Sequence, residues 1–270
     1  MVIRTALVGL GSIAPYHLRA LIGNKDYQLT TVMDASPAKV SQFKEKYLQG
    51  TDMQTTSKLD FLDKKDIDLV VLATPPSTHY NLAIKSMNHG KNVICEKPIA
   101  TSLKQAETML SESTKKHLIL YPAYHAAFNP ITLAAVEKLK GQEIKSVNIV
   151  YRECVRNYHP ESSWLFDPAI SGGGCLADSG INAFSIAFSI LGGERKDVRI
   201  NDAELRYEKG IKVETGASVS LDVKGVPIRL EQEWTIPKDA KETRKVTFMT
   251  SSGNYTVDIV DKKLSLEDMG

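Results

Sequence analysis

The sequence predicts an α/β protein built from two domains, and two patterns carry that prediction. In residues 1–122, short apolar runs alternate with stretches in which apolar residues recur at helical spacing. Strands separated by helices of about 10–15 residues form parallel sheets with helices on both faces. In residues 123–270, runs that alternate polar and apolar residues indicate an antiparallel sheet with one solvated face. We therefore expect a doubly wound parallel sheet in 1–122 and an α+β domain on an open, mainly antiparallel sheet in 123–270.

Each element of the first domain has a local signal. The apolar runs predict strands at 3–8, 28–34, 67–74, 91–96 and 117–123. Helical spacing predicts helices at 13–22, 36–48, 77–90 and 102–113. Ser36 and Ser77 stand where N-terminal caps are expected, and Ser102 with Gln105 forms a capping box. The run 67–74 is almost wholly apolar, as expected of a strand covered on both faces.

The second domain begins with one more helix, after which the regular alternation of strands and helices ends. Asn129 and Pro130 start a helix that ends before Gly141. A strand follows at 146–154, then an irregular segment at 155–171 and an apolar helix after Asp178. The alternating runs of the sheet lie at 217–223, 227–234, 245–251 and 254–260. We expect helices on one side of this open sheet.

Composition argues against several classes of partner. Lys and Arg together number 34 and Asp and Glu 32, so the net charge of +2 gives no basic excess for nucleic acid or an anionic membrane. Three widely spaced cysteines are typical of reduced thiols in a cytoplasmic protein. No signal peptide is recognisable, and no window has the roughly 18 apolar residues of a membrane-spanning helix. No spacing of His, Cys and Asp suits a metal. We expect a soluble, cytoplasmic protein without a metal site.

A glycine turn joins the first strand to the first helix. Its pattern Gly9-x-Gly11-x-x-Ala14, with Ser12 and Ile13 inside it, is typical of dinucleotide-binding (Rossmann) domains. Gly9 permits a tight turn, Gly11 lets the backbone approach a pyrophosphate, and Ala14 keeps the helix close to the strand. The helix N-terminus favours the phosphate charge. The alternative is a glycine-rich turn that binds no ligand.

An acidic residue at the end of the second strand bears on the choice of cofactor. Asp34 stands 20 residues after Ala14, where a carboxylate accepts hydrogen bonds from ribose hydroxyls and repels a 2′-phosphate. NAD is therefore the favoured cofactor. Ser36 and Lys39 could accept a phosphate, so NADP stays open.

Two stretches make the assignment more specific. They are ATPPSTHYNLAIKSMNHGKNVICEKPIA at 73–100 and GGGCLADSGIN at 172–182. Together they resemble the Gfo/Idh/MocA family of nicotinamide-dependent sugar oxidoreductases, and the resemblance runs from Val2 to about Leu191. It implies a small-molecule sugar substrate and assembly through the open sheet, as a homodimer or homotetramer. The family usually continues beyond Gly270 with further strands and a long helix, so either the protein is naturally short or this sequence is cut; if that helix is absent, we expect a looser cleft between the domains.

The triplet Glu96-Lys97-Pro98 is characteristic of that family. The resemblance implies that Lys97 reaches the nicotinamide ribose and the reacting hydroxyl. Lys97 also follows a predicted parallel strand, at the sheet edge where such folds bind ligands, and a cationic nicotinamide ring would help it to give up its proton. Glu96 could pair with it, and the alternative is a Glu–Lys pair on the surface. Four further residues are implied to lie against the cofactor: Thr74, Pro75, Pro76 and His79.

The segment from 155 to 184 resembles a branch of the family, the aldose 1-dehydrogenases acting on L-arabinose, D-galactose and similar sugars. The matching positions are Val155, Arg156, Tyr158, His159, Pro160, Trp164, Asp178, Gly180, Ile181 and Asn182. Many other members of the family have His where this chain has Asn182. An amide cannot act as a general base, so a proton must go to Lys97 or Asp178.

The spacing of Asp178 and Asn182 places them on one face of a helix, one turn apart. We expect them to hold the C1 hydroxyl and the ring oxygen, and to act with Lys97 as the catalytic residues. The alternative for Asp178 is a plain helix N-cap. The further candidates for substrate binding are His125, Arg156, His159, Trp164 and Trp234.

Each of these further candidates has a structural alternative. Arg156 could pair with a surface acid, and His125 and Trp234 could pack in the core. His17, His89 and His117 have no partner pattern, so we expect them to be surface or packing residues.

The resemblance and the residues together predict an NAD(P)-dependent enzyme. A hydride leaves C1 of a cyclic aldose for the nicotinamide, a proton leaves its hydroxyl, and the product is a lactone. The alternatives are an inositol or keto-sugar dehydrogenase, a cofactor-dependent glycosidase, and a sensor that binds the cofactor without turnover.

Overall fold

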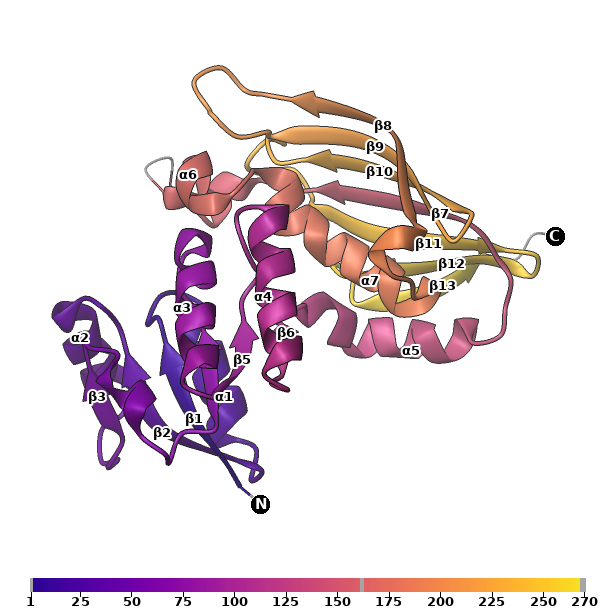
Figure 1. Ribbon diagram of the computed structural model, residues 1–270. Helices are drawn as coiled ribbons and strands as arrows, with labels where there is room; N and C mark the ends of the chain where they lie inside the picture. Colours follow the sequence, from indigo (N-terminus) through magenta and orange to yellow (C-terminus); the bar gives the residue numbers. More distant parts are fainter. Residues whose placement is uncertain (1, 161–162, 268–270) are drawn as a thin grey trace. The chain divides into compact units, whose positions relative to one another are not determined.

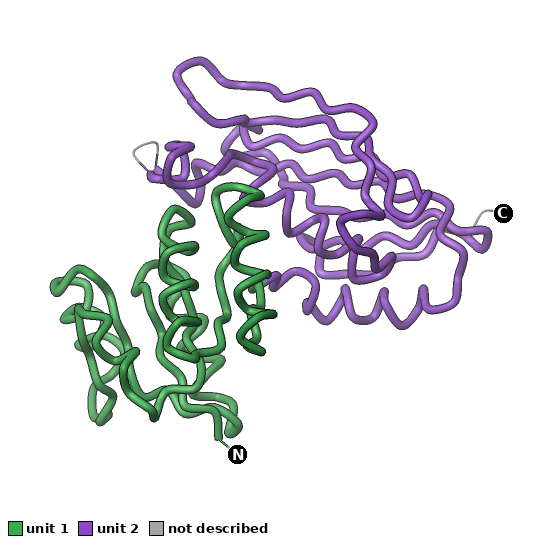
Figure 2. The backbone as a smooth tube through the Cα atoms, viewed as in Figure 1, with its two compact units in different colours: residues 1–123 green, residues 124–270 purple. Residues whose placement is uncertain are grey.

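The structure is a computed structural model that describes residues 2–160 and 163–267. The chain forms two compact units, residues 1–123 and 124–270 (Figure 2). The boundary lies one residue from the position expected at 122/123. Residues 161–162 of the irregular segment 155–171 and residues 268–270 at the chain end lie outside the described residues.

Unit 1 is built on a six-stranded sheet in the order β3-β2-β1-β4-β5-β6, and every adjacent pair is parallel (Figure 1). The strands are β1 Ile3–Val8, β2 Tyr27–Met33, β3 Gln54–Thr56, β4 Leu69–Leu72, β5 Asn92–Cys95 and β6 Leu120–Pro122. The predicted doubly wound fold is confirmed. Strand β3 was not predicted, because three polar residues give no apolar run.

The helices of unit 1 are α1 Ala14–Ile22, α2 Pro37–Tyr47, α3 Pro76–Asn88 and α4 Leu103–Lys115, with a 3-10 turn at Asp60–Asp63. Ser36 caps α2, as predicted, by accepting from the Lys39 backbone N–H. Ser102 caps α4, but only half of the predicted capping box forms, because the Gln105 side chain accepts from Thr101 instead. The prediction for Ser77 is wrong: the cap position of α3 is Pro75.

Strand β4 shows that the sheet of unit 1 is buried on both faces, which gives this unit three layers. Val70 and Leu72 belong to one buried cluster, whereas Leu69 and Val71 belong to another. Successive side chains of a strand point to opposite faces of the sheet, so the sheet is covered on both sides. The continuous apolar run 67–74 is therefore explained by burial of both faces.

Unit 2 is built on a seven-stranded mixed sheet in the order β13-β12-β11-β7-β10-β9-β8. The strands are β7 Ile144–Arg152, β8 Val198–Arg206, β9 Gly216–Val223, β10 Val226–Glu233, β11 Thr243–Thr250, β12 Gly253–Asp258 and β13 Lys263–Glu267. Strands β7 and β10 pair in parallel, and the other adjacent pairs are antiparallel. The edge strands β8 and β13 were not predicted individually, although both alternate polar and apolar residues; most of their side chains are exposed or only half-buried.

One face of this sheet carries the helices α5 Pro130–Leu139 and α7 Ile181–Leu191 (Figure 1). Helix α5 packs against β12 and β13, and α7 packs against β7 and β11. The shorter elements are α6 Pro168–Ser171, a π-helical turn at Leu176–Gly180, and 3-10 turns at His125–Phe128, Val155–Asn157, Trp164–Phe166 and Arg195–Asp197.

The helical run Pro168–Leu191 is long and apolar enough, by length and composition alone, to cross a membrane. No membrane-spanning helix was predicted, and this one candidate is only weak evidence against that prediction. Ala183, Ile186 and Ala187 of this run are fully buried in the hydrophobic core of unit 2. A core helix passes the same test, so the finding carries little weight for a membrane.

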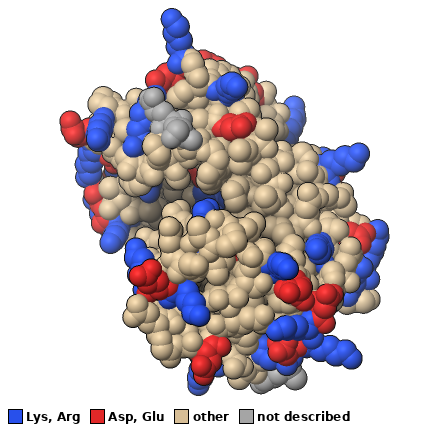
Figure 3. Space-filling view, turned by 90° about the vertical axis from the view of Figure 1, so that its left-hand side faces the viewer, with Lys and Arg blue, Asp and Glu red and all other residues tan. Residues whose placement is uncertain are grey.

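Charged side chains of both signs are interspersed on the face of the molecule shown in Figure 3. Among the described side chains in that view, no large area of a single sign forms. This distribution agrees with the net charge of +2.

Candidate active site

The glycine turn of unit 1 lies where the ends of β1 and β4 meet. Gly9 has a φ of +93°, and a Cβ there would lie 2.5 Å from the carbonyl oxygen of Ala73. Only glycine therefore permits this close approach of the two strand ends. The strand order reverses between β1 and β4, which is where open α/β sheets bind ligands.

The rest of the turn is open to a ligand. A Cβ on Gly11 would meet no atom within 4 Å, whereas Ala14 is fully buried at the start of α1. Ser12 and Ile13 are exposed, and among the described residues no side chain caps α1. The Ala14 and Tyr16 N–H groups donate to the Gly11 and Ile13 carbonyl oxygens, so what this helix start offers a pyrophosphate is the positive end of its dipole and the open space over Gly11.

Asp34 ties the end of β2 to the glycine turn. Its Oδ2 accepts from the Leu10 backbone N–H at 2.9 Å, and its Oδ1 accepts from the Ser36 N–H at 2.9 Å. Each carboxylate oxygen keeps a lone pair that a ribose hydroxyl could use. The Ser36 hydroxyl is occupied as a helix cap, and Lys39 is exposed.

His79 joins the loops that follow β4 and β5. Its ring is fully buried, with Nε2 2.7 Å from the Thr74 carbonyl oxygen and Nδ1 2.9 Å from the Pro98 carbonyl oxygen. Both ring nitrogens therefore contact the protein, and none is left for a cofactor. This corrects the expectation for His79: it holds the turn Thr74–Pro76 and the Lys97–Pro98 segment together rather than binding the cofactor itself.

Glu96 has a partner that sequence reasoning missed. Its Oε1 accepts from His17 Nε2 at 2.8 Å, and its Oε2 accepts from the Lys97 backbone N–H at 3.2 Å. Burial raises the pKa of Glu96, but the hydrogen bond and charge of His17, with the charge of Lys97, bring the pKa below its ordinary value. The carboxylate is therefore ionised beside Lys97. His17 lies one turn after the glycine turn, which is the signal that could have found it.

Asp178 lies inside the π-helical turn Leu176–Gly180, and Asn182 follows in α7. The Asp178 backbone N–H already donates to the Gly174 carbonyl oxygen at 3.0 Å. The N-cap alternative therefore does not apply. Asn182 Oδ1 is buried and has no hydrogen-bond partner among the described residues. A buried polar atom without a partner is costly, and a ligand hydroxyl could satisfy it.

A buried hydroxyl next to Asp178 fixes this turn. Ser179 Oγ accepts from Gln232 Nε2 at 2.5 Å and from Trp234 Nε1 at 2.9 Å, and it donates to the Cys175 carbonyl oxygen at 3.3 Å. Both lone pairs and the proton of the hydroxyl are used. The π-helical turn is thus hydrogen-bonded to strand β10 and the residue that follows it.

The glycines around this turn allow close backbone contacts. A Cβ on Gly180 would lie 2.6 Å from Gln232 Oε1, and one on Gly174 would lie 2.0 Å from the Glu214 carbonyl oxygen. That carbonyl accepts from the Cys175 N–H at 2.9 Å. The glycines therefore serve packing around the Asp178 turn.

The five further candidates for substrate binding differ in their exposure and in their partners. Arg156 pairs with Glu208, Nη2 to Oε1 at 2.6 Å, which is the surface-pair alternative. His125 and Trp164 are exposed, and His159 is half-buried. Trp234 is corrected: it is fully buried, so it belongs to the core and cannot line an open pocket.

We predict that Ser179→Ala destabilises unit 2 by about 1–3 kcal/mol, because it removes the hydroxyl that joins two buried donors. Both tryptophans, Trp164 and Trp234, lie in unit 2, so urea unfolding followed by tryptophan fluorescence reports on it. Ser189→Ala, on the exposed side of α7, is the control and should cost less. Equal losses in the two variants would contradict this role.

Burial lowers the pKa of His79, although its two carbonyl contacts and Glu96 oppose this. In the unfolded chain the ring titrates near pH 6.5. Below that pH the unfolded state takes up a proton that the folded state still refuses, so stability falls as pH falls and is retained above it. Chemical denaturation followed by circular dichroism, at about pH 7 and pH 5.5, should show a smaller pH dependence in His79→Gln than in a variant of the exposed His117. An identical dependence would refute the assignment.

Comparison with known proteins identifies the family of each unit. The family model "Oxidoreductase family, NAD-binding Rossmann fold" matches residues 3–124, and the model "GFO/IDH/MocA C-terminal domain" matches residues 134–256. Galactose 1-dehydrogenase of Pseudomonas fluorescens is 26% identical over 268 residues, which cover 98% of this chain and 81% of the relative. The crystal structure of D-galactose-1-dehydrogenase from Rhizobium etli superposes with a TM-score of 0.81, at 26% identity, and covers 99% of this chain and 84% of its own.

Inositol dehydrogenases are also similar. Inositol 2-dehydrogenase of Rhizobium meliloti (strain 1021) is 29% identical over 208 residues, which cover 76% of this chain and 60% of the relative. The chain thus spans less than two thirds of the length of that relative. Because two family models match the two units in order, the chain belongs to the Gfo/Idh/MocA family of oxidoreductases, and its first unit is the family's NAD-binding Rossmann domain.

Proposed function

We propose that the protein is an NAD(P)-dependent sugar dehydrogenase that oxidises C1 of a cyclic aldose to a lactone. The observation that carries this proposal is the pair Asp178 and Asn182. The family resemblance implies that many other members have a histidine base at the position of Asn182. The similarity to galactose 1-dehydrogenase, which extends over 98% of the chain, supports the same substrate class.

Residues of unit 1 would hold the cofactor. The open space over Gly11 and the uncapped start of α1 suit the pyrophosphate, and Asp34 suits the ribose hydroxyls. When bound, NAD accepts the hydride that leaves the sugar's C1 with the electron pair of the C–H bond. The carboxylate of Asp34 favours NAD over NADP.

Side chains of the protein would take up the proton and position the sugar. The C1 hydroxyl gives its proton to Lys97 or Asp178, and its oxygen becomes the carbonyl oxygen of the lactone. Asn182 cannot take that proton, because an amide is not a base at neutral pH. Its buried amide instead exchanges a hydrogen bond with the sugar and fixes the ring. Arg156, His159 and Trp164 would contact the rest of the sugar.

A polyol substrate is the second candidate. It is supported by the inositol 2-dehydrogenase, which is 29% identical over 76% of this chain. The chemistry at the reacting carbon would be the same, except that a ketone would replace the lactone. Asn182 favours the aldose. The further alternatives are a keto-sugar dehydrogenase, a cofactor-dependent glycosidase and a sensor without turnover.

We also propose that the protein works in the cytoplasm as a homodimer or homotetramer. All three cysteines, Cys95, Cys154 and Cys175, are free and buried, which suits a reducing compartment. The open face of the sheet in unit 2 offers a surface for a second copy.

A panel of free aldoses and inositols with NAD or NADP, followed by absorbance of the reduced nicotinamide, tests the reaction directly. We expect turnover with an aldose, and Lys97→Ala should lower kcat by about 10²–10⁴. Lys85→Ala, an exposed lysine on α3, is the control. Normal turnover of Lys97→Ala would remove Lys97 from the mechanism. Tight cofactor binding without turnover of any sugar would favour the sensor.

Cofactor choice can be tested at Asp34. The variant Asp34→Asn removes the negative charge and keeps one oxygen, which can accept from either the Leu10 or the Ser36 amide but not in the geometry that serves both. We expect the ratio of kcat/KM for NADP over NAD to rise by about tenfold or more, as expected when a charge repulsion of about 1.4 kcal/mol is lost. An unchanged ratio would show that Asp34 does not select the cofactor.

A further inference from the structure

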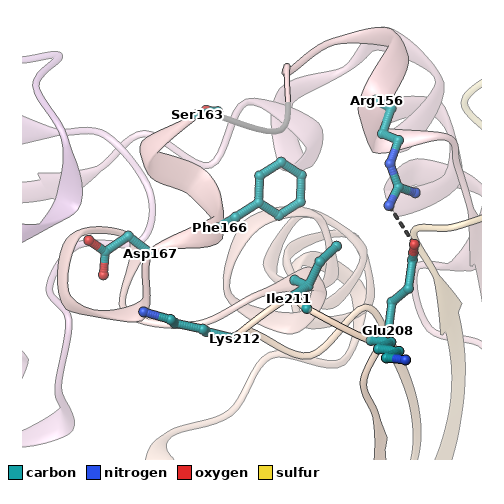
Figure 4. A pocket seen from close by; sticks show the side chains of 9 residues that line it. Arg156, Ser163, Phe166, Asp167, Glu208, Ile211 and Lys212 are labelled. Carbon is teal, nitrogen blue, oxygen red and sulfur yellow. Dashed lines mark hydrogen bonds and ion pairs between the residues drawn. The ribbon is translucent and has the colours of Figure 1, made fainter.

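Unit 2 contains a cavity of about 460 Å³ lined by Arg156, by Ser163, Phe166 and Asp167, and by the loop 208–212 (Figure 4). Its volume falls in the range of small-molecule sites, about 300–1,000 Å³. All of its lining residues belong to unit 2. The reaction proposed above uses one of them, Arg156, and leaves the rest of the cavity without a role.

The centre of the cavity is apolar. Phe166 and Ile211 lie in its middle, and both are half-buried (Figure 4). The Phe166 ring also packs edge-on against Trp234, with ring centroids 6.2 Å apart and an interplanar angle of 76°. Because Trp234 is fully buried, Phe166 is held in place and offers a fixed aromatic surface.

Polar groups of both signs flank that surface. Arg156 and Glu208 form an ion pair on one wall. Asp167 and Lys212 lie on another, and Asp167 Oδ1 is oriented by accepting from the Ala169 N–H at 3.0 Å. A neutral polyol can donate to the carboxylates and accept from the cations at once, because each hydroxyl does both. With Lys209, the lining holds three cations and two carboxylates, so it offers both donors and acceptors to the hydroxyls of a polyol.

The cavity is connected to the Asp178 turn. Two residues after Lys212, the carbonyl oxygen of Glu214 accepts from the Cys175 N–H at 2.9 Å, and its Oε1 accepts from the Leu176 N–H at 3.2 Å. Two residues span at most about 7 Å. The cavity wall is therefore anchored to the start of the helical turn that carries Asp178.

We propose that this cavity is a second saccharide subsite, and that the substrate is an oligosaccharide of at least two rings. One ring is held at Asp178 and Asn182, and the next lies on Phe166 and Ile211 with its hydroxyls bound to the flanking charged pairs. This inference rests on the proposed function and names the substrate class more narrowly. An apolar ring face on an aromatic side chain, with charged groups at its rim, is the arrangement that a pyranose ring requires.

Calorimetric titration of the full chain tests the subsite without relying on turnover. Cellobiose, maltose and lactose are compared with glucose and galactose in the presence of NADH. We expect at least one disaccharide to bind about tenfold or more tightly than its monosaccharides. The variant Ile211→Trp, which fills the cavity, should reduce the ratio of disaccharide to monosaccharide affinity by about tenfold. The control Ile200→Trp changes a residue on β8 that is 68% exposed, and it should keep the ratio.

Three outcomes would overturn the subsite: equal affinity for disaccharides and monosaccharides, no binding of any saccharide, or an Ile211→Trp ratio equal to that of the wild type. Turnover is measured separately with the same sugars. Oxidation of monosaccharides without a disaccharide preference rejects the subsite and keeps the proposed reaction. Disaccharide binding that depends on Ile211, without oxidation, keeps the subsite and rejects the reaction.

Discussion

The imidazole of His79 is the contact on which the candidate chemistry of the Rossmann domain depends. It lies between the carbonyl oxygens of Thr74 and Pro98 and so fixes the loop after β4 against the loop that carries Lys97. A glycine at position 9 lets the end of β1 reach the same place, because no Cβ would fit against Ala73. These contacts leave the conformation of each loop little freedom. The side chain of Lys97 therefore projects from a backbone that is fixed before any ligand binds, which lowers the cost of binding.

In unit 2 a buried hydroxyl, rather than an imidazole, fixes the backbone next to the candidate catalytic residue. Ser179 uses its full hydrogen-bonding capacity within the protein, one residue from Asp178. The neutral His79 ring can donate to only one of its two carbonyl contacts, whereas the Ser179 hydroxyl uses both lone pairs and its proton. Asn182 differs, because its buried Oδ1 has no partner among the described residues. Gln232 Oε1 is likewise buried without a partner in the described part of the chain, so Asn182 is distinguished by its place one turn from Asp178 as well as by its unpaired oxygen.

Local patterns predicted much of the fold and part of the site. The apolar run 67–74 and the Ser36 cap are encoded by neighbouring residues, and the spacing Gly9-x-Gly11-x-x-Ala14 located the glycine turn, although the contact of Gly9 with Ala73 is long-range. The partners of buried polar groups are not encoded by neighbouring residues. His17 and Glu96 lie 79 residues apart, and the two donors to Ser179, Gln232 and Trp234, lie 53 and 55 residues from it. Burial of His79 and Trp234 likewise depends on packing over long distances in sequence, so both were assigned to ligand contacts from the family resemblance or their neighbours alone.

The proposed function requires that Lys97 and the Asp178–Asn182 pair act on the same carbon of a sugar. A crystal structure of the protein with NADH and a bound aldose or lactone would test it most directly. The account predicts that Lys97 Nζ and an Asp178 carboxylate oxygen both lie within about 3 Å of the oxygen on C1, with C1 facing the nicotinamide ring. A sugar that presents another carbon to the ring, or one that contacts neither Asp178 nor Asn182, would contradict it.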